Sequence, residues 1–299
     1  MADGEKFQIQ EISKQLTKIG RSLSFHTIGP KCCKVELPSR DCCLNMMQQL
    51  RSVLFPGFFQ LSEFSEEAIV FHIGAILDRV AIDLREQVRR GFCFCCDGNN
   101  NHDQCIERAE KITRAFLERI PAVMILLGED VQAAYRGDPA AKSLSEIIFC
   151  YPGIFAITNH RIAHELFKLE VPVIPRIISE NAHSATGIDI HPGAQIGKGF
   201  FIDHGTGVVI GETAIVGNRV RIYQGVTLGA KSFPLDEKGN PIKGMPRHPI
   251  IEDDVVIYAG ATILGRITIG ARSAIGGNVW LTQSVPPNSS VLQGQEHKF

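Results

Sequence analysis

The sequence predicts an α+β chain, with an N-terminal α-helical domain followed by a parallel β-helix. In the first 180 or so residues, apolar side chains recur at helical spacing and turn residues separate the segments. From Ile190 onward the spacing changes, and an aliphatic residue appears every six positions. A six-residue repeat is the signature of a β-helix, in which each hexad supplies one short strand and one corner.

The helical domain is expected to span residues 1–185 and to contain four clear helices. The first begins after Ser65 and repeats apolar residues every three or four positions from Ile69. The other three are expected at about residues 106–120, 122–135 and 144–169, the last with a bend at Pro152-Gly153. The first 45 residues have a weaker helical pattern and are expected to be partly mobile.

The β-helix is expected over residues 186–286, with a C-terminal tail at 287–299. Thirteen aliphatic residues carry the repeat: Ile190, Ile196, Ile202, Ile210, Val216, Ile222, Leu228, Ile251, Ile257, Ile263, Ile269, Ile275 and Leu281. Because three hexads form one coil, thirteen hexads are expected to form about four coils with these side chains stacked inside.

The repeat is interrupted twice. Between Ile202 and Ile210, eight residues stand where six are expected, and this bulge contains Asp203 and His204 with two glycines. The second interruption is a loop at residues 230–250, which ends in Arg247-His248-Pro249. Loops of this length inside a compact repeat are mostly functional, so both interruptions are candidate site elements.

The residues at the interruptions fit acyl transfer to a hydroxyl. A hydroxyl is barely acidic near neutral pH, so the reaction needs a base such as the His204 imidazole within hydrogen-bond distance. Asp189 precedes His204 by slightly less than three hexads, nearly one coil, so it is expected on the neighbouring rung. There it would fix the imidazole tautomer. Asp203 suits a substrate ammonium, and Arg247 suits a substrate carboxylate. The alternative is that His204 is structural.

The composition is that of an ordinary globular protein of 299 residues, with 44% hydrophobic residues, 21% charged residues and a net charge of −1. This predicts no nucleic-acid or membrane partner, and no apolar stretch reaches membrane-spanning length. The N-terminal residues do not resemble a signal peptide. The nine cysteines are an odd number and include three adjacent pairs, which suggests reduced thiols, so a cytoplasmic location is expected. A zinc site built from Cys93, Cys95, Cys96, His102 and Cys105 is a weaker alternative, because the spacing matches no zinc knuckle.

Several motifs together resemble the serine O-acetyltransferases, a family of hexapeptide-repeat acyltransferases. They are Gly187-Ile-Asp-Ile-His-Pro-Gly-Ala, Ile202-Asp-His-Gly-Thr-Gly-Val-Val-Ile-Gly-Glu-Thr-Ala, Tyr223-Gln-Gly-Val-Thr-Leu-Gly-Ala, Arg247-His-Pro and Asp130-Val-Gln-Ala-Ala-Tyr-Arg-Gly-Asp-Pro-Ala. The resemblance covers about residues 125–285. It implies a left-handed β-helix, a homotrimer or dimer of trimers with active sites between subunits, and transfer of acetyl from acetyl-CoA to L-serine as the first step of cysteine biosynthesis.

The resemblance also implies roles for individual residues. His204 would be the catalytic base, with Asp189 as its partner. The residues implied to bind serine are Asp130, Asp203, Arg247 and His248, and those implied to lie along acetyl-CoA are Gly229, Ala259 and Gly277. No metal is expected, and His160 and His164 are expected to be structural. Trp280 is expected at an outward-facing position, as packing.

Other readings stay open. The acceptor could be homoserine, a sugar or a xenobiotic, or the chain could be a non-enzymatic partner of cysteine synthase. Family members that dock into cysteine synthase use a terminal isoleucine, so the terminal Phe299 puts that complex, and feedback inhibition by cysteine, in question. A zinc-dependent carbonic anhydrase would need more histidines in suitable repeat positions than His191, His204 and His248 provide.

Overall fold

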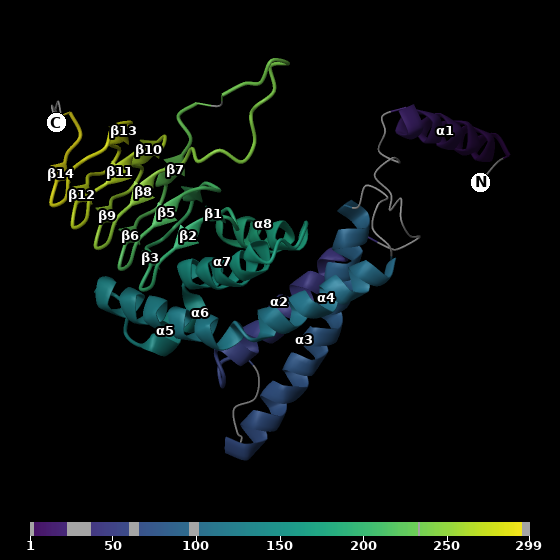
Figure 1. Cartoon of the computed structure of the whole chain (residues 1–299), viewed down its shortest axis with the longest axis horizontal. Coiled ribbons are helices and arrows are strands. Elements are labelled where there is room, and N and C mark those ends of the chain that lie inside the picture. Colours follow the sequence, from purple (N-terminus) through teal and green to yellow (C-terminus); the bar gives the residue numbers. More distant parts are fainter. Residues whose placement is uncertain (1–2, 23–36, 60–65, 96–101, 233, 295–299) are drawn as a thin grey trace.

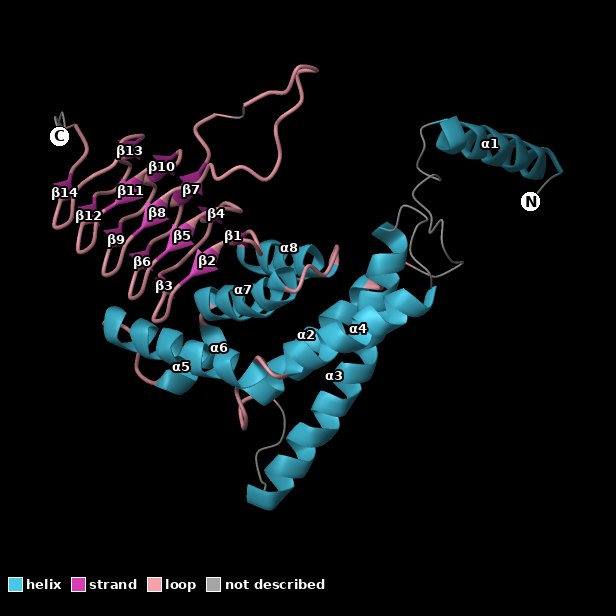
Figure 2. Ribbon diagram, viewed as in Figure 1, coloured by secondary structure: helices cyan, strands magenta, loops and turns pink. Residues whose placement is uncertain are grey.

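The computed structural model describes residues 3–22, 37–59, 66–95, 102–232 and 234–294. Within them, α-helices fill the N-terminal part and short parallel strands fill the C-terminal part, as the sequence predicts (Figures 1 and 2). The helices are α1 (Asp3–Ser22), α2 (Arg40–Leu54), α3 (Glu66–Cys95), α4 (His102–Leu117), α5 (Ile120–Gly137), α6 (Leu144–Cys150), α7 (Pro152–Lys168) and α8 (Ile174–Thr186).

The predicted helices are present, with two corrections to their bounds. Ile120 begins α5 rather than ending the preceding helix, because Pro121 fits the first turn of a helix. The segment expected at 144–169 is two helices, since Tyr151 has an extended backbone and separates α6 from α7. Three further helices, α1, α2 and α8, were not predicted as separate elements. None of the described helices is both long and apolar enough to cross a membrane.

The β-helix consists of very short parallel strands in three sheets. Sheet A holds β1 (Asp189–Ile190), β4 (Val209–Ile210), β7 (Thr227–Gly229), β10 (Thr262–Leu264) and β13 (Trp280–Leu281). Sheet B holds β2 (Gln195–Ile196), β5 (Ile215–Val216), β8 (Ile250–Ile251) and β11 (Thr268–Ile269). Sheet C holds β3 (Phe201–Ile202), β6 (Arg221–Ile222), β9 (Val256–Ile257), β12 (Ala274–Ile275) and β14 (Ser290–Val291).

Every third strand pairs, so each coil contains three hexads, and all thirteen predicted aliphatic residues lie in strands. All of them except the half-buried Ile196 are buried. One strand was missed: β14 pairs with β12, so the β-helix continues past the predicted boundary at residue 286. Ser290 pairs with Ala274 although the chain between them falls short of three full hexads, which hides β14 from a strict six-residue count.

Both interruptions appear in the pairing register. Val209 pairs with Thr227, three hexads further along the chain. Asp189 pairs with Val209, and the stretch between them is longer than three hexads because it contains the bulge. Ile215 pairs with Ile250, so the second interruption lengthens its coil by nearly three further hexads. This segment, called the arm below (residues 230–250), projects from the β-helix between β7 and β8 (Figure 1).

The helices hold the first coil of the β-helix. Helices α5 and α7 pack against β3, and α8 packs against β1. Gly153 at the start of α7 approaches β3 so closely that a Cβ there would lie 2.5 Å from the carbonyl oxygen of Ile202. Since Ile202 directly precedes the bulge, this contact fixes where the bulge begins.

The candidate zinc cluster is only partly within the described residues. Cys93 and Cys105 are buried on α3 and α4. Cys96 and the side chains of Cys95 and His102 lie outside the described residues. The tail from residue 295, with Phe299, lies outside them as well.

Candidate active site

His204 stands exposed on the bulge, at the corner that leads from sheet C into sheet A. Its backbone is left-handed (φ 57°), and its side chain is 70% exposed. The next residue, Gly205 (φ 93°), lies so close to Ile188 that a Cβ there would sit 2.5 Å from it. A non-glycine residue in this conformation costs on the order of 1–3 kcal/mol, so the bulge is a strained element that presents an imidazole to the outside.

Two carboxylates accompany His204. The Nε2 atom of His204 lies 3.9 Å from Oδ1 of Asp203. Asp138, just after α5, accepts a hydrogen bond from the Tyr151 hydroxyl at 2.5 Å and another from the backbone N–H of Ala140 at 2.8 Å. The Tyr151 and Ala140 hydrogen bonds lower the pKa of Asp138, and the nearby Arg221 and His204 lower it further.

Arg221 holds Asp203 in place. Its Nη2 donates to Asp203 Oδ2 at 3.3 Å, and its guanidinium lies 5.1 Å from the ring centre of Phe201 and 4.9 Å from that of Tyr223. We call Asp138, Tyr151, Asp203, His204 and Arg221 the bulge cluster. It brings an imidazole and two carboxylates to one corner, which suits a substrate with a hydroxyl and an ammonium.

A second group of polar residues lies where the arm rejoins the β-helix, at the corner between sheets A and B. Arg247 donates from Nη2 to Glu212 Oε2 at 2.7 Å. The backbone N–H groups of Arg247 and His248 both donate to Oγ1 of Thr213, at 2.9 and 3.2 Å. We call His191, Glu212, Thr213, Arg247 and His248 the arm-base cluster. It places a guanidinium and an imidazole side by side, which suits a carboxylate.

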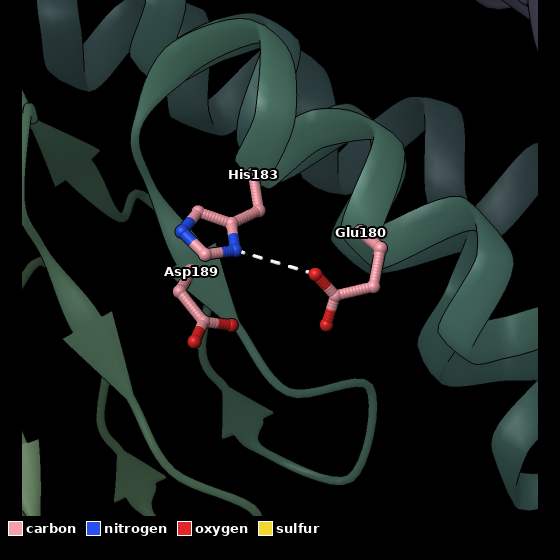
Figure 3. Close-up of side chains that lie close together, drawn as sticks. All are labelled: Glu180, His183 and Asp189. Atoms are coloured by element: carbon pink, nitrogen blue, oxygen red, sulfur yellow. Dashed lines mark hydrogen bonds and ion pairs between the residues drawn. The ribbon is translucent and has the colours of Figure 1, made fainter.

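Asp189 does not lie beside His204 within the chain, contrary to the sequence prediction. The bulge lengthens this coil beyond three hexads, so Asp189 pairs with Val209, well past His204. Its neighbours are instead Glu180 and His183 on α8. A carboxylate oxygen of each acidic residue and a ring nitrogen of His183 all lie within 4.8 Å of one another (Figure 3). Among the described residues, Asp189 and His204 share no hydrogen bond or ion pair.

Asp130 does not fit a substrate-binding role, which corrects the sequence prediction. Its side chain is fully buried and accepts two hydrogen bonds from Arg161, at 2.6 and 2.8 Å, and one from the backbone N–H of Phe200 at 2.9 Å. Arg161 also donates to the carbonyl oxygens of Ile196 and Gly197, at 3.2 and 2.8 Å. Asp130 therefore ties α5 and α7 to the first coil.

The carboxylate that the structure does offer from this region is Asp138, which stands later in the same motif. The sequence signal was available, because Gly137-Asp138-Pro139 ends a helix and leaves its carboxylate only partly buried. Thr213 and Arg221 were missed for a different reason. Each acts on a residue one coil away, and a linear pattern does not show that proximity.

The predicted acetyl-CoA residues divide between two corners. Ala259 and Gly277 are neighbours at the corner of His204: a Cβ on Gly277 would lie 3.2 Å from the Ala259 carbonyl oxygen. Gly229 ends β7, at the far side of sheet A, where it pairs with Leu264. Tyr223 and Tyr258 stack at 5.3 Å beside Ala259. The corner of His204 thus continues as a column of small residues lined by aromatic rings.

Two other predictions concern side chains outside these clusters. His160 is buried and its ring stacks on His164 at 5.6 Å. Burial lowers the pKa of both. His164 Nδ1 lies 2.8 Å from the Pro192 carbonyl oxygen, which joins α7 to the β-helix. Trp280 is 70% exposed on the outer face of sheet A, so it faces outward as expected.

Comparison with known proteins identifies the class first. The family model described as bacterial transferase hexapeptide (six repeats) matches residues 248–283. These residues cover strands β8 to β13, which follow the arm. The fold, the repeat and an exposed histidine at a repeat break therefore define a hexapeptide-repeat transferase, with a left-handed β-helix.

More similar relatives identify the family. The plasmid serine acetyltransferase of Synechococcus elongatus is 57% identical over 263 residues, which cover 87% of this chain and 82% of the relative. Serine acetyltransferase isoform 3 from Entamoeba histolytica, solved in complex with cysteine, has a TM-score of 0.71 and 39% identity over 85% of this chain and 82% of that one. Soybean serine acetyltransferase, solved with serine, has a TM-score of 0.55 and 30% identity over 86% and 98%. The chain belongs to the serine acetyltransferase family.

Proposed function

We propose that the chain transfers the acetyl group of acetyl-CoA to the hydroxyl of L-serine, with His204 as the general base. The observation that carries this proposal is the bulge cluster, in which an exposed imidazole lies 3.9 Å from the Asp203 carboxylate and close enough to Asp138 to lower the pKa of that carboxyl. Relatives solved with serine and with its thiol analogue cysteine support an amino-acid acceptor. The product, O-acetylserine, would supply the carbon skeleton for cysteine biosynthesis.

The reaction needs no covalent enzyme intermediate. His204 removes the serine hydroxyl proton as the oxygen attacks the thioester carbonyl, and the resulting tetrahedral intermediate collapses by breaking the carbon–sulfur bond. The protonated imidazole then gives its proton to the departing CoA thiolate. Asp203 and Asp138 would bind the serine ammonium, because they are the carboxylates next to the base.

We infer that a complete site forms only between two copies of the chain, in a homotrimer. Within one chain, the bulge cluster and the arm-base cluster lie at opposite ends of the sheet A strands. A neighbouring copy would bring Arg247 and His248, and with them Asp189, to the bulge cluster of the first. The predicted pairing of Asp189 with His204 would then be made across the interface, as rings of closed symmetry allow.

Co-expression of two inactive variants tests this arrangement. His204→Ala removes the proposed base from the bulge cluster, and Arg247→Ala removes the guanidinium from the arm-base cluster. If each site takes the bulge from one chain and the arm base from its neighbour, random mixing restores about a quarter of wild-type activity. Sites built within one chain would give no recovery above the two variants alone.

Acetyl-CoA would lie along the column of small residues that begins at His204. Its thioester would lie next to the His204 imidazole, and the rest of the cofactor would extend past Ala259 and Gly277. Gly229 of the neighbouring chain would line the other side. Thiol release from acetyl-CoA measures the reaction directly, and the acceptor is identified by comparing serine with homoserine and a sugar. Serine-dependent release that disappears in His204→Ala supports the proposal, and equal turnover with a sugar contradicts it.

A reducing compartment such as the cytoplasm fits the thiols of the chain. Cys42, Cys43, Cys105 and Cys150 are free cysteines. Burial raises the pKa of Cys43 to about 12, so this thiol stays protonated and unreactive.

A further inference from the structure

His248 is fixed in place by hydrogen bonds to one of its ring nitrogens. Its side chain sits at the base of the arm and the residue is only 7% exposed. Two groups of Thr213 meet the Nδ1 atom: the backbone N–H at 3.1 Å and the hydroxyl Oγ1 at 2.9 Å. A backbone N–H can only donate, so Nδ1 is the acceptor in that contact.

The hydroxyl of Thr213 points its own proton at the same nitrogen. Its oxygen already accepts the backbone N–H groups of Arg247 and His248. With both acceptor positions used, the remaining contact of the hydroxyl, to Nδ1, is one in which the hydroxyl donates. A proton on Nδ1 would therefore face two donors, so the neutral ring carries its hydrogen on Nε2.

The residues packed around the His248 imidazole leave little room for another orientation of the ring. Nη1 of Arg266 donates to the carbonyl oxygens of Thr213, at 2.7 Å, and His248, at 3.0 Å, and so joins the two backbone segments. A Cβ on Gly211 would lie 2.0 Å from both Cδ2 and Nε2 of the ring. The imidazole is thus seated against a glycine that no larger residue can replace without moving it.

Most of the charges that face His248 oppose a second proton. Three of them, Arg247, Arg266 and His191, disfavour a positive charge on the ring, whereas Glu212, whose carboxylate is paired with Arg247, favours one. Burial and, next, Arg247 lower the pKa of His248 to about 4. The ring is neutral at ordinary pH.

We propose that Thr213 is a positioning residue that holds His248 as a neutral hydrogen-bond donor, whose Nε2–H binds the carboxylate of the amino-acid substrate beside Arg247. This inference rests on the proposed function for the identity of that substrate. It assigns different tasks to the two site histidines: His204 takes the proton, and His248 only donates a hydrogen bond. Binding of the carboxylate then does not depend on the titration of His248 between about pH 6 and 8.

Nuclear magnetic resonance of the full-length enzyme labelled with 15N-histidine tests the tautomer. The signals of His248 are identified by their loss in His248→Gln. We expect one protonated and one unprotonated ring nitrogen, the protonated one being Nε2, with no change between about pH 6 and 8. An Nδ1–H form or an imidazolium at pH 7 overturns the inference.

Kinetics of matched variants test the role of Thr213. Thr213→Val keeps the shape and the backbone N–H but loses the hydroxyl. We expect it to raise KM for serine about tenfold, with little change in KM for acetyl-CoA, and to mix the two His248 tautomers. Thr213→Ser restores the hydroxyl and is expected to restore both values. An unchanged KM for serine in Thr213→Val overturns the positioning role.

Gly211→Ala is a second test that removes no polar group. It displaces the ring through a steric contact alone, so the same rise in KM for serine is expected, and an unchanged KM counts against the inference. Because the resonance measurement needs no turnover, the two proposals fail separately. Wild-type protein that shows the Nε2–H form but does not acetylate serine would overturn the proposed function while supporting the fixed tautomer.

Discussion

The two interruptions of the hexapeptide repeat each carry a histidine, and the two histidines differ in solvent exposure. The short bulge leaves His204 70% exposed on a left-handed backbone. The much longer arm returns to the coil with His248 only 7% exposed and its Nδ1 occupied by Thr213. In the proposed reaction the same side chain would thus serve two purposes, because a base needs a nitrogen lone pair open to the substrate and a fixed donor does not.

The difference also explains why the site residues divide into two clusters. A short insertion stays at its own corner, so the bulge cluster forms around residues of sheet C and α5. A long insertion can project and return, and its end is fixed by Thr213 one coil below. The clusters therefore occupy separate corners of one chain, and in the proposed trimer a second copy would bring them together.

The largest effect should come from replacing His204 with a residue that cannot take a proton. His204→Ala is expected to lower kcat by at least about a hundredfold, because no other group takes its place as base. His248→Gln keeps a donor N–H and is expected to act mainly on KM for serine. Steady-state thiol release at saturating acetyl-CoA measures both. A kcat loss in His248→Gln equal to that of His204→Ala would break the distinction.

A second prediction concerns stability rather than chemistry. Asp130→Asn leaves the buried guanidinium of Arg161 without its carboxylate, and removing one partner of a buried ion pair costs about 3–5 kcal/mol. Urea unfolding measures the loss, with the exposed Asp41→Asn as the control. Near-normal stability with a selective loss of serine binding would instead return Asp130 to the substrate-binding set.

Replacing Asp138 should affect serine binding rather than stability, which is the reverse of the expectation for Asp130. Asp138→Asn removes a partly exposed charge beside His204, and hydrogen bonds to charged groups contribute about 1.5–3 kcal/mol, so KM for serine should rise at least about tenfold. The melting temperature should change little. Titration of serine in the thiol-release assay checks the first expectation, and a thermal scan checks the second. Unchanged serine kinetics would remove Asp138 from the bulge cluster's function.

The smallest effect is a pH dependence of folding stability. The pKa of His248 falls from 6.5 to about 4 on folding, so the unfolded chain binds more protons between these values. The folding stability that depends on a neutral His248 is therefore fully present above the unfolded pKa of 6.5. It is lost as pH falls from there through the folded pKa of about 4. Urea unfolding from pH 7 to pH 4 should show a shallower loss in His248→Gln than in wild type. Parallel curves would show that His248 is not buried as a neutral group.

The β-helix could be predicted from the amino-acid pattern alone, because stacking demands the same kind of aliphatic residue at every sixth position, from Ile190 to Leu281, and leaves a linear record. Both interruptions could be located in the same way, and with them His204, Asp203, Arg247 and His248, since a break in a strict period is visible without coordinates. The family resemblance of the motifs added the reaction, and the comparisons agree with it.

Which of these residues meet became clear only from the folded chain. The bulge lengthens its coil, which moves Asp189 away from His204. Asp130 is buried against Arg161, while Asp138 stays partly exposed near His204. The saturation of one His248 nitrogen by Thr213 is likewise visible only in the structure. The reason is physical: a repeat sets the distance between coils, but contacts depend on register, burial and hydrogen-bond partners from segments far apart in the chain.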